Sequence, residues 1–207
     1  MRWCSLFALC VGLSACGDRA ALKPSESLVG AENLPTAKVL SREIIHINGG
    51  LGRWPGDPGS LEYDLGPDSS LSVTHRKIDK DGNQAVVGRE MFRLSSAAAA
   101  DARRALWRLR PETLQGIQAE ARPIGCRPPD PDSFPEFFVN FISEGPKPGF
   151  ADDKFGIVLV PNKDDCRSAQ GGEARELVQS VLQSFPPSKV AVDFEREVSR
   201  YKAQMGR

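Results

Sequence analysis

The residues with the most suggestive spacing for chemistry lie between positions 79 and 90. Oxygen-bearing side chains stand at the first, third, fifth and twelfth places of a loop, namely Asp79, Asp81, Asn83 and Glu90. Calcium loops use these places, but they need glycine at the sixth place for a sharp turn. Here that place is Gln84, and Asp81-Gly82 between two apolar alternations is typical of a hairpin turn. We therefore predict a β-hairpin and no metal site.

Two histidines, His46 and His75, are available as general bases near neutral pH. Each lies within an alternating strand pattern, with His46 between Ile45 and Ile47. We expect both to be half-buried strand histidines. The sequence has neither the Gly-x-Ser-x-Gly motif of serine hydrolases nor the His-Glu-x-x-His motif of zinc proteases. It predicts no catalytic residue and no cofactor.

Carboxylate pairs leave one enzymatic alternative open. A glycosidase needs only two carboxylates that the fold brings together. The pairs in this chain stand among proline, lysine and glycine, as in solvated loops: Asp130 with Asp132, Asp152 with Asp153, and Asp164 with Asp165. Nothing in the sequence marks which two would act, so a hydrolase stays an alternative.

The loop at residues 49–58 is rich in glycine and proline and carries Arg53 beside Trp54. It lacks the Gly-Lys-Ser/Thr of a phosphate-binding loop. Arginine and tryptophan are the residue types that dominate protein interfaces, so this pair is our candidate for partner binding. In the alternative, Trp54 covers the edge of the core and Arg53 lies in solvent.

A basic stretch follows near Trp107 and comprises Arg103, Arg104, Arg108 and Arg110. Such a row could meet an acidic partner or anionic lipid. More often it forms a solvated helix face, and this is the interpretation we prefer.

The first residues have the outline of a secretory leader. Arg2 is followed by an uncharged, largely apolar run up to Ala15 and then by Cys16. The run is too short to cross a membrane, which takes about 20 apolar residues. We interpret residues 1–15 as a signal peptide.

The residues Leu13-Ser14-Ala15-Cys16 resemble the lipobox of bacterial lipoproteins. The resemblance covers only the leader. It implies cleavage by signal peptidase II and a diacylglycerol on the thiol of Cys16, so that the partner at this end of the chain is a membrane. In lipoproteins of enteric bacteria, aspartate directly after this cysteine favours retention in the inner membrane. Here that place is Gly17, which favours the outer membrane, facing the periplasm.

The composition gives no reason to expect a nucleic-acid partner. The chain has 207 residues, with 27 Lys and Arg balanced by 27 Asp and Glu. Binding to DNA or RNA usually draws on an excess of basic residues. Beyond the lipobox, Cys126 and Cys166 are the two remaining cysteines, and in an oxidising compartment we expect them to form one disulfide.

The pattern of apolar residues predicts an α+β fold. Residues 16–38 are mixed and polar and are interpreted as a lipidated, flexible tether, and residues 39–207 as a single domain. In that domain, alternating residues predict strands near 39–47, 61–65, 71–73, 87–94, 137–142, 155–160 and 190–194. Helical spacing occurs at 95–109 and 174–185, and again in a charged tail.

These elements predict an antiparallel sheet with two main amphipathic helices packed on one face. Two stretches of strand followed by an Ala-Arg helix suggest a weak internal repeat of two strands and a helix.

For function, the sequence favours a membrane-anchored periplasmic lipoprotein that is a non-catalytic protein-binding module. An immunity or inhibitor protein would be of this kind. A structural or assembly lipoprotein of the envelope and the hydrolase are the alternatives.

Overall fold

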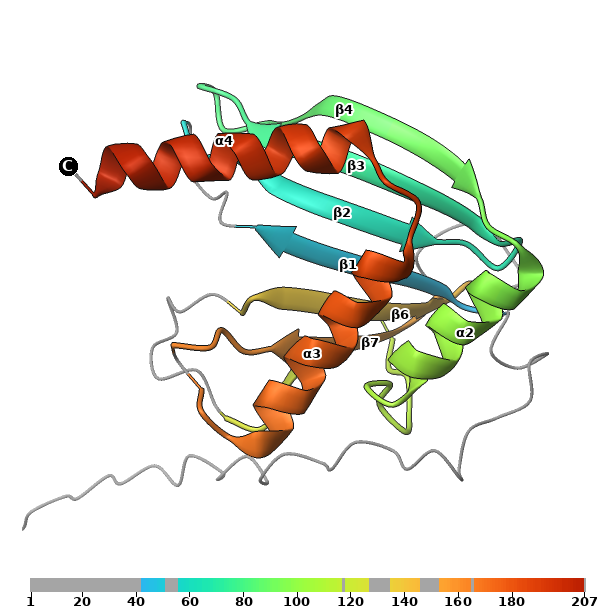
Figure 1. The fold of residues 1–207 in the computed structure, drawn as a ribbon. Coiled ribbons are helices and arrows are strands. Elements are labelled where there is room, and N and C mark those ends of the chain that lie inside the picture. The colour runs from blue at the N-terminus through green and yellow to red at the C-terminus, as the bar shows by residue number, and fades with distance from the viewer. Residues whose placement is uncertain are drawn as a thin grey trace, which may run out of the picture.

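A seven-stranded β-sheet carries helices on one of its faces in the computed structural model of the chain (Figure 1). The structure describes residues 42–50, 56–116, 118–126, 135–145, 153–164 and 166–206. The strands are β1 (Ile44–Gly50), β2 (Ser60–Leu65), β3 (Ser70–Ile78), β4 (Gln84–Arg93), β5 (Ala121–Pro123), β6 (Phe137–Ser143) and β7 (Lys154–Val160). The helices are α2 (Ser96–Trp107), α3 (Ala169–Ser184) and α4 (Lys189–Met205).

The strands lie in the order β4-β3-β2-β1-β6-β7-β5. All neighbouring pairs are antiparallel except β5 with β7. The predicted α+β class is therefore confirmed. Strand β5 was not predicted, because its three residues lie in a proline-rich stretch where no alternation can develop.

The alternation in β1 shows how the sheet separates its two faces. Ile45 and Ile47 are both 2% exposed and belong to the hydrophobic core, whereas His46 between them points to the opposite face. The helices all cover the core face (Figure 1). In this layer α4 packs on β3 and β4, α3 packs on β7, and α2 packs against α3.

Each helix begins at a serine that caps its N-terminus. The side chains of Ser95, Ser168 and Ser188 each accept a hydrogen bond from the backbone N–H three residues later. Helix α3 ends before Pro186 and Pro187, whose rings cannot continue it. The helices expected at 95–109 and 174–185 are thus present with slightly different bounds.

The strand expected at residues 190–194 is wrong. This segment is the first part of α4. Val190, Val192 and Phe194 do alternate, but Ala191, Phe194 and Val198 also share one helical face, and they pack against the core cluster. A segment of five residues is compatible with both the strand alternation and the helical repeat. The cap at Ser188 and the packing on β3 favour the helix.

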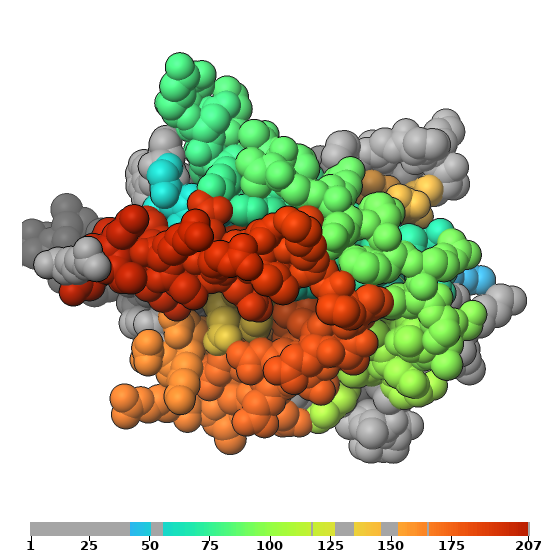
Figure 2. Space-filling model, turned by 45° about the horizontal axis from the view of Figure 1, so that its top comes forward, coloured from blue at the N-terminus to red at the C-terminus, as the bar shows by residue number. Residues whose placement is uncertain are grey.

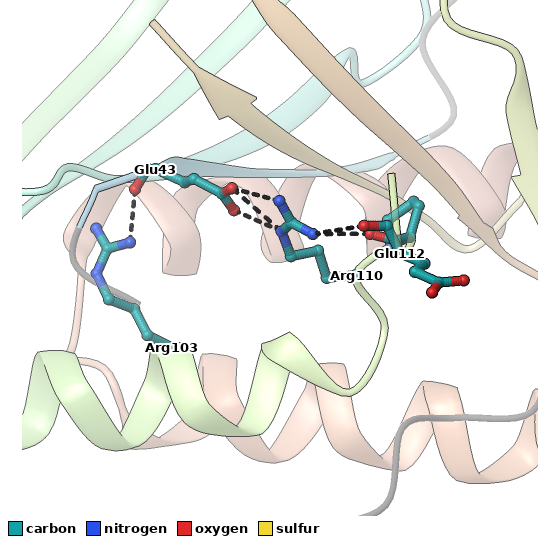
Figure 3. A network of polar contacts seen from close by, with 5 residues as sticks. Glu43, Arg103, Arg110 and Glu112 are labelled. Carbon is teal, nitrogen blue, oxygen red and sulfur yellow. Dashed lines mark hydrogen bonds and ion pairs between the residues drawn. The ribbon is translucent and has the colours of Figure 1, made fainter. Parts of the chain in front are cut away.

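The basic stretch of α2 is also not one solvated face. Arg103 is 2% exposed, and its guanidinium donates to the carbonyl oxygens of Glu43 at 2.5 Å, Leu65 at 2.9 Å and Gly66 at 2.5 Å. Arg110 pairs with the carboxylate of Glu43 at 2.7 Å (Figure 3). Both arginines hold α2 and the segment after it to the start of β1.

The other two arginines of this stretch make ion pairs nearer the surface. Arg104 contacts Asp101 within α2 at 2.8 Å, and its side chain is 49% exposed. Arg108 pairs with Glu173 of α3, which links the two helices. The prediction of a solvated row therefore fails for Arg103 and Arg110 and describes Arg104 best.

Candidate binding groove

A groove of about 890 Å³ lies between α3 and α4, above the middle of the sheet. Figure 2 shows it as a hollow between the red α4 and the orange α3. It closes where the segment 185–188 joins the two helices and opens toward the C-terminal end of α4. We call this the α3–α4 groove.

The floor of the groove is apolar and belongs to β1, β2 and β6. Its side chains are Ile47, Leu61, Tyr63 and Phe137. The first two are buried, whereas Tyr63 and Phe137 are only partly buried. Beside them Gly49 contributes backbone alone, and a Cβ there would come within 3.1 Å of the Phe137 ring. Glycine at this position keeps the floor open.

The walls come from one stripe on each helix. On α4 the groove is lined by Val192 and Phe194 and by four residues spaced four, three and four apart: Ala191, Glu195, Val198 and Lys202. This spacing places them on one helical face. On α3 the lining residues are Gln179, Leu182 and Gln183. Leu182 and Val198 are partly buried and pack against the core, so the groove is a continuation of the core surface.

Tyr63 is a polar group set into this apolar floor. Burial, and then the negative charge of Glu195, raise the pKa of Tyr63 to about 12. Its hydroxyl therefore stays neutral over the physiological range and can donate a hydrogen bond. Among the described residues no side chain or backbone group bonds to this hydroxyl. The ring lies 6.1 Å from that of Phe185 at the closed end.

Two lysines stand at the open end, which we call the mouth. Lys163 follows β7 on one side, and Lys202 lies on α4 on the other. Neither makes an ion pair within the described part of the chain. Glu136 on the same rim is already bound, because Gln179 donates to it at 2.8 Å. The mouth thus offers two available positive charges.

The opposite face of the sheet holds a histidine–aspartate pair. His46 Nδ1 lies 2.6 Å from Asp64 Oδ1, with the two side chains 20% and 36% exposed. Asn140 is paired with His46 across β1 and β6, and its Oδ1 is buried without a partner among the described residues. Such a pair orients an imidazole and leaves Nε2 available, but by itself it defines no reaction.

His75 has a structural place. It is 6% exposed, and its Nε2 lies 2.6 Å from the carbonyl oxygen of Pro58. Its ring stands edge-on to Phe194 at 5.1 Å. The expectation of half-buried strand histidines is confirmed for His46, whereas His75 lies in a strand as expected but is buried.

The loop at residues 79–83 is the predicted hairpin turn. Asp79 Oδ1 accepts from the backbone N–H groups of Asp81 and Asn83, both at 2.9 Å, and Gly82 has a φ of +83°. Glu90 instead accepts a hydrogen bond from Ser188 of α4. No group of three or more His, Cys, Asp or Glu side chains among the described residues could hold a metal ion.

Cys126 and Cys166 are joined by a disulfide, with their Cα atoms 5.7 Å apart. The bond ties the segment after β5 to the start of α3, and Cys166 is 2% exposed. It therefore fixes the segment that leads into α3.

Three predicted site residues lie outside the described part of the chain. They are the lipidation site Cys16 and the pair Arg53 and Trp54. Gly50, the last residue of β1, lines the groove, and Trp54 follows it by four residues. Four residues of extended chain span at most about 14 Å, which is the largest possible distance between Gly50 and Trp54.

The groove was not predicted from the sequence. Its key residues form no local motif, because Tyr63 lies on β2, Lys163 in the loop after β7 and Lys202 on α4. One local pattern does point to it, because a helix that includes residues 190–194 places four groove-lining residues of α4 on one face.

None of the described helices combines the length and apolar character needed to span a membrane. No protein-family model matches the chain, and no curated protein matches its sequence.

Proposed function

We propose that this chain is a lipid-anchored lipoprotein facing the periplasm, whose folded domain is a non-catalytic module that binds a protein partner. The observation that carries the proposal is the open, largely apolar α3–α4 groove. Binding sites are commonly concave, with volumes of about 300 to 1,000 Å³.

The character of the groove supports a binding role. Aromatic and aliphatic side chains make most of its surface, and Tyr63 supplies one hydrogen-bond donor in their midst. Ligand-binding sites commonly combine a concave apolar lining with a few placed polar groups. Exposed Val192, at 50%, extends the apolar surface onto the rim, where a larger partner could rest.

The lipobox supports the cellular place of this activity. A diacylglycerol on Cys16 would hold the domain near a membrane, and the outer membrane is favoured by Gly17. A tether of about 20 residues would allow a span of about 25 Å, so the groove could meet a partner in the periplasm. An immunity or inhibitor protein, which blocks a toxin or lytic enzyme, fits such a module.

Site-specific photo-crosslinking tests this proposal in the producing cell. A photoreactive amino acid at Val192, on the groove rim, should yield one discrete protein adduct. The same group at Met91, which is 63% exposed on β4, is the matched control and should not yield that adduct. The substitution Val198→Glu, which places a charge in the groove, should abolish it. An identical adduct from Met91, or no adduct from Val192, would refute the proposal.

A further inference from the structure

We propose that the segment which enters the α3–α4 groove is an amphipathic α-helix of the partner, with an apolar stripe toward the floor and acidic side chains at the mouth. This inference rests on the proposed function, because it names the part of a protein partner that occupies the groove.

The width of the gap in the helical layer matches one helix. Helix α3 packs on β7 and α4 on β3, and the strands between them are β6, β1 and β2. Four strand spacings make about 19 Å. The two helices converge at the segment 185–188, so this separation applies only toward the mouth, where a third helix at the usual packing distance of about 8–10 Å has room between them. The segment 185–188 closes the other end, so the helix must enter at the mouth (Figure 1).

The stripe on α4 has the spacing that helix pairs use. Four of the α4 residues that line the groove follow one another at intervals of four, three and four, as the contact positions of helix–helix seams do. Ala191 and Val198 alternate along it with Glu195 and Lys202. An extended peptide would need a free strand edge to form hydrogen bonds with its backbone N–H and C=O groups. A helix forms these hydrogen bonds within itself. The floor between α3 and α4 consists of paired central strands and offers no such edge.

The charges along the groove decide where the partner is acidic. Lys163 and Lys202 face the mouth from opposite walls. Glu195 lies seven residues before Lys202, about 10 Å deeper along α4. Acidic side chains are therefore favoured at the mouth and disfavoured farther in. Tyr63 near the closed end can donate a hydrogen bond to a carbonyl or side-chain oxygen of the inserted helix.

Designed helical peptides provide the test. Two fluorescent 14-residue peptides (about four turns) carry the same leucine stripe, but one has two glutamates at one end and the other has two lysines there. A third has the composition of the first with the stripe scrambled. Binding is measured by fluorescence anisotropy on the chain from residue 16 onward, with Cys16→Ser to prevent lipidation.

We expect the glutamate peptide to bind about tenfold more tightly than the lysine peptide, since two ion pairs replace two repulsions. The scrambled peptide should not bind. The double substitution Lys163→Glu with Lys202→Glu should reverse the preference. Lys80→Glu with Lys154→Glu, the same charge change at exposed lysines outside the groove, should leave it unchanged.

Several results would overturn the inference without touching the proposed function. Equal binding of the two striped peptides would remove the role of the lysines, and binding of the scrambled peptide would remove the helix. If peptides bound only after deletion of residues 16–41, the occupant would be the tether of this chain. Failure of all peptides while the Val192 adduct persists would mean another kind of segment. Loss of the adduct as well would refute the proposed function.

Discussion

At the scale of single residues, Arg103 shows how a buried charge can stabilise the fold. Its guanidinium satisfies carbonyl oxygens at the ends of two strands that would otherwise face the underside of α2. Burial lowers the pKa of Arg103, but arginine remains protonated in proteins. The nearby charge of Glu43 acts in the opposite direction and helps to retain the proton.

We predict that Arg103→Met lowers the free energy of unfolding by about 3 kcal/mol, because it leaves buried carbonyl oxygens without donors. The matched control is Arg104→Met, one residue along α2, where the exposed side chain makes an ion pair within the helix. This change should cost less than about 0.5 kcal/mol. Urea unfolding followed by circular dichroism measures both, and equal effects would contradict a structural role of Arg103.

At the scale of elements, the start of α4 is held by a carboxylate on the edge strand. Glu90 Oε2 accepts from the hydroxyl of Ser188 at 2.5 Å and from the backbone N–H of Val190 at 3.3 Å. These bonds, the first above all, hold the pKa of Glu90 below its usual range. Farther along, Lys77 of β3 pairs with Glu197 of α4.

A carboxylate with a lowered pKa stabilises the folded state above its unfolded pKa, and this contribution is lost as pH falls through the folded pKa. We therefore predict that the N-terminal turn of α4 loosens as the pH falls below 4.5, the usual value for glutamate. Hydrogen exchange of α4 amides should accelerate there. Glu90→Gln should cause the faster exchange already at pH 7, whereas Glu176→Gln, at an exposed site on α3, should not. A pH response that persists in Glu90→Gln would assign it elsewhere.

The elements also show what a sequence can and cannot predict. The strands of the hairpins and α2 and α3 were predictable, because their periodicity is local and serine or proline marks their ends. Residues 190–194 were not, since tertiary packing chose between two periods. Arg103 was misjudged because burial of a charge depends on carbonyls 37 to 60 residues away. The groove is formed by residues of separate elements, so no local sequence pattern indicates it.

At the scale of the whole molecule, we propose that attachment and binding belong to separate parts of the chain. The lipobox lies at one end of the sequence, whereas the groove is built from β1 through α4. The formal charge of the chain is zero, so we expect electrostatics to contribute little to membrane attachment and the lipid to supply it. Two or three acyl chains give stable anchoring where one gives marginal binding.

We predict that Cys16→Ser releases the protein from the membrane fraction without changing its fold. Metabolic labelling with radioactive palmitate should fail for this variant, and flotation of membranes should leave it in the soluble fraction. Cys10→Ser is the matched control, because this cysteine lies within the leader and has no part in the lipobox. That variant should be labelled and should float with the membranes. Since attachment and binding are separate, purified Cys16→Ser should still bind through the α3–α4 groove. A variant that stays with the membranes without label would show that another part of the chain anchors it.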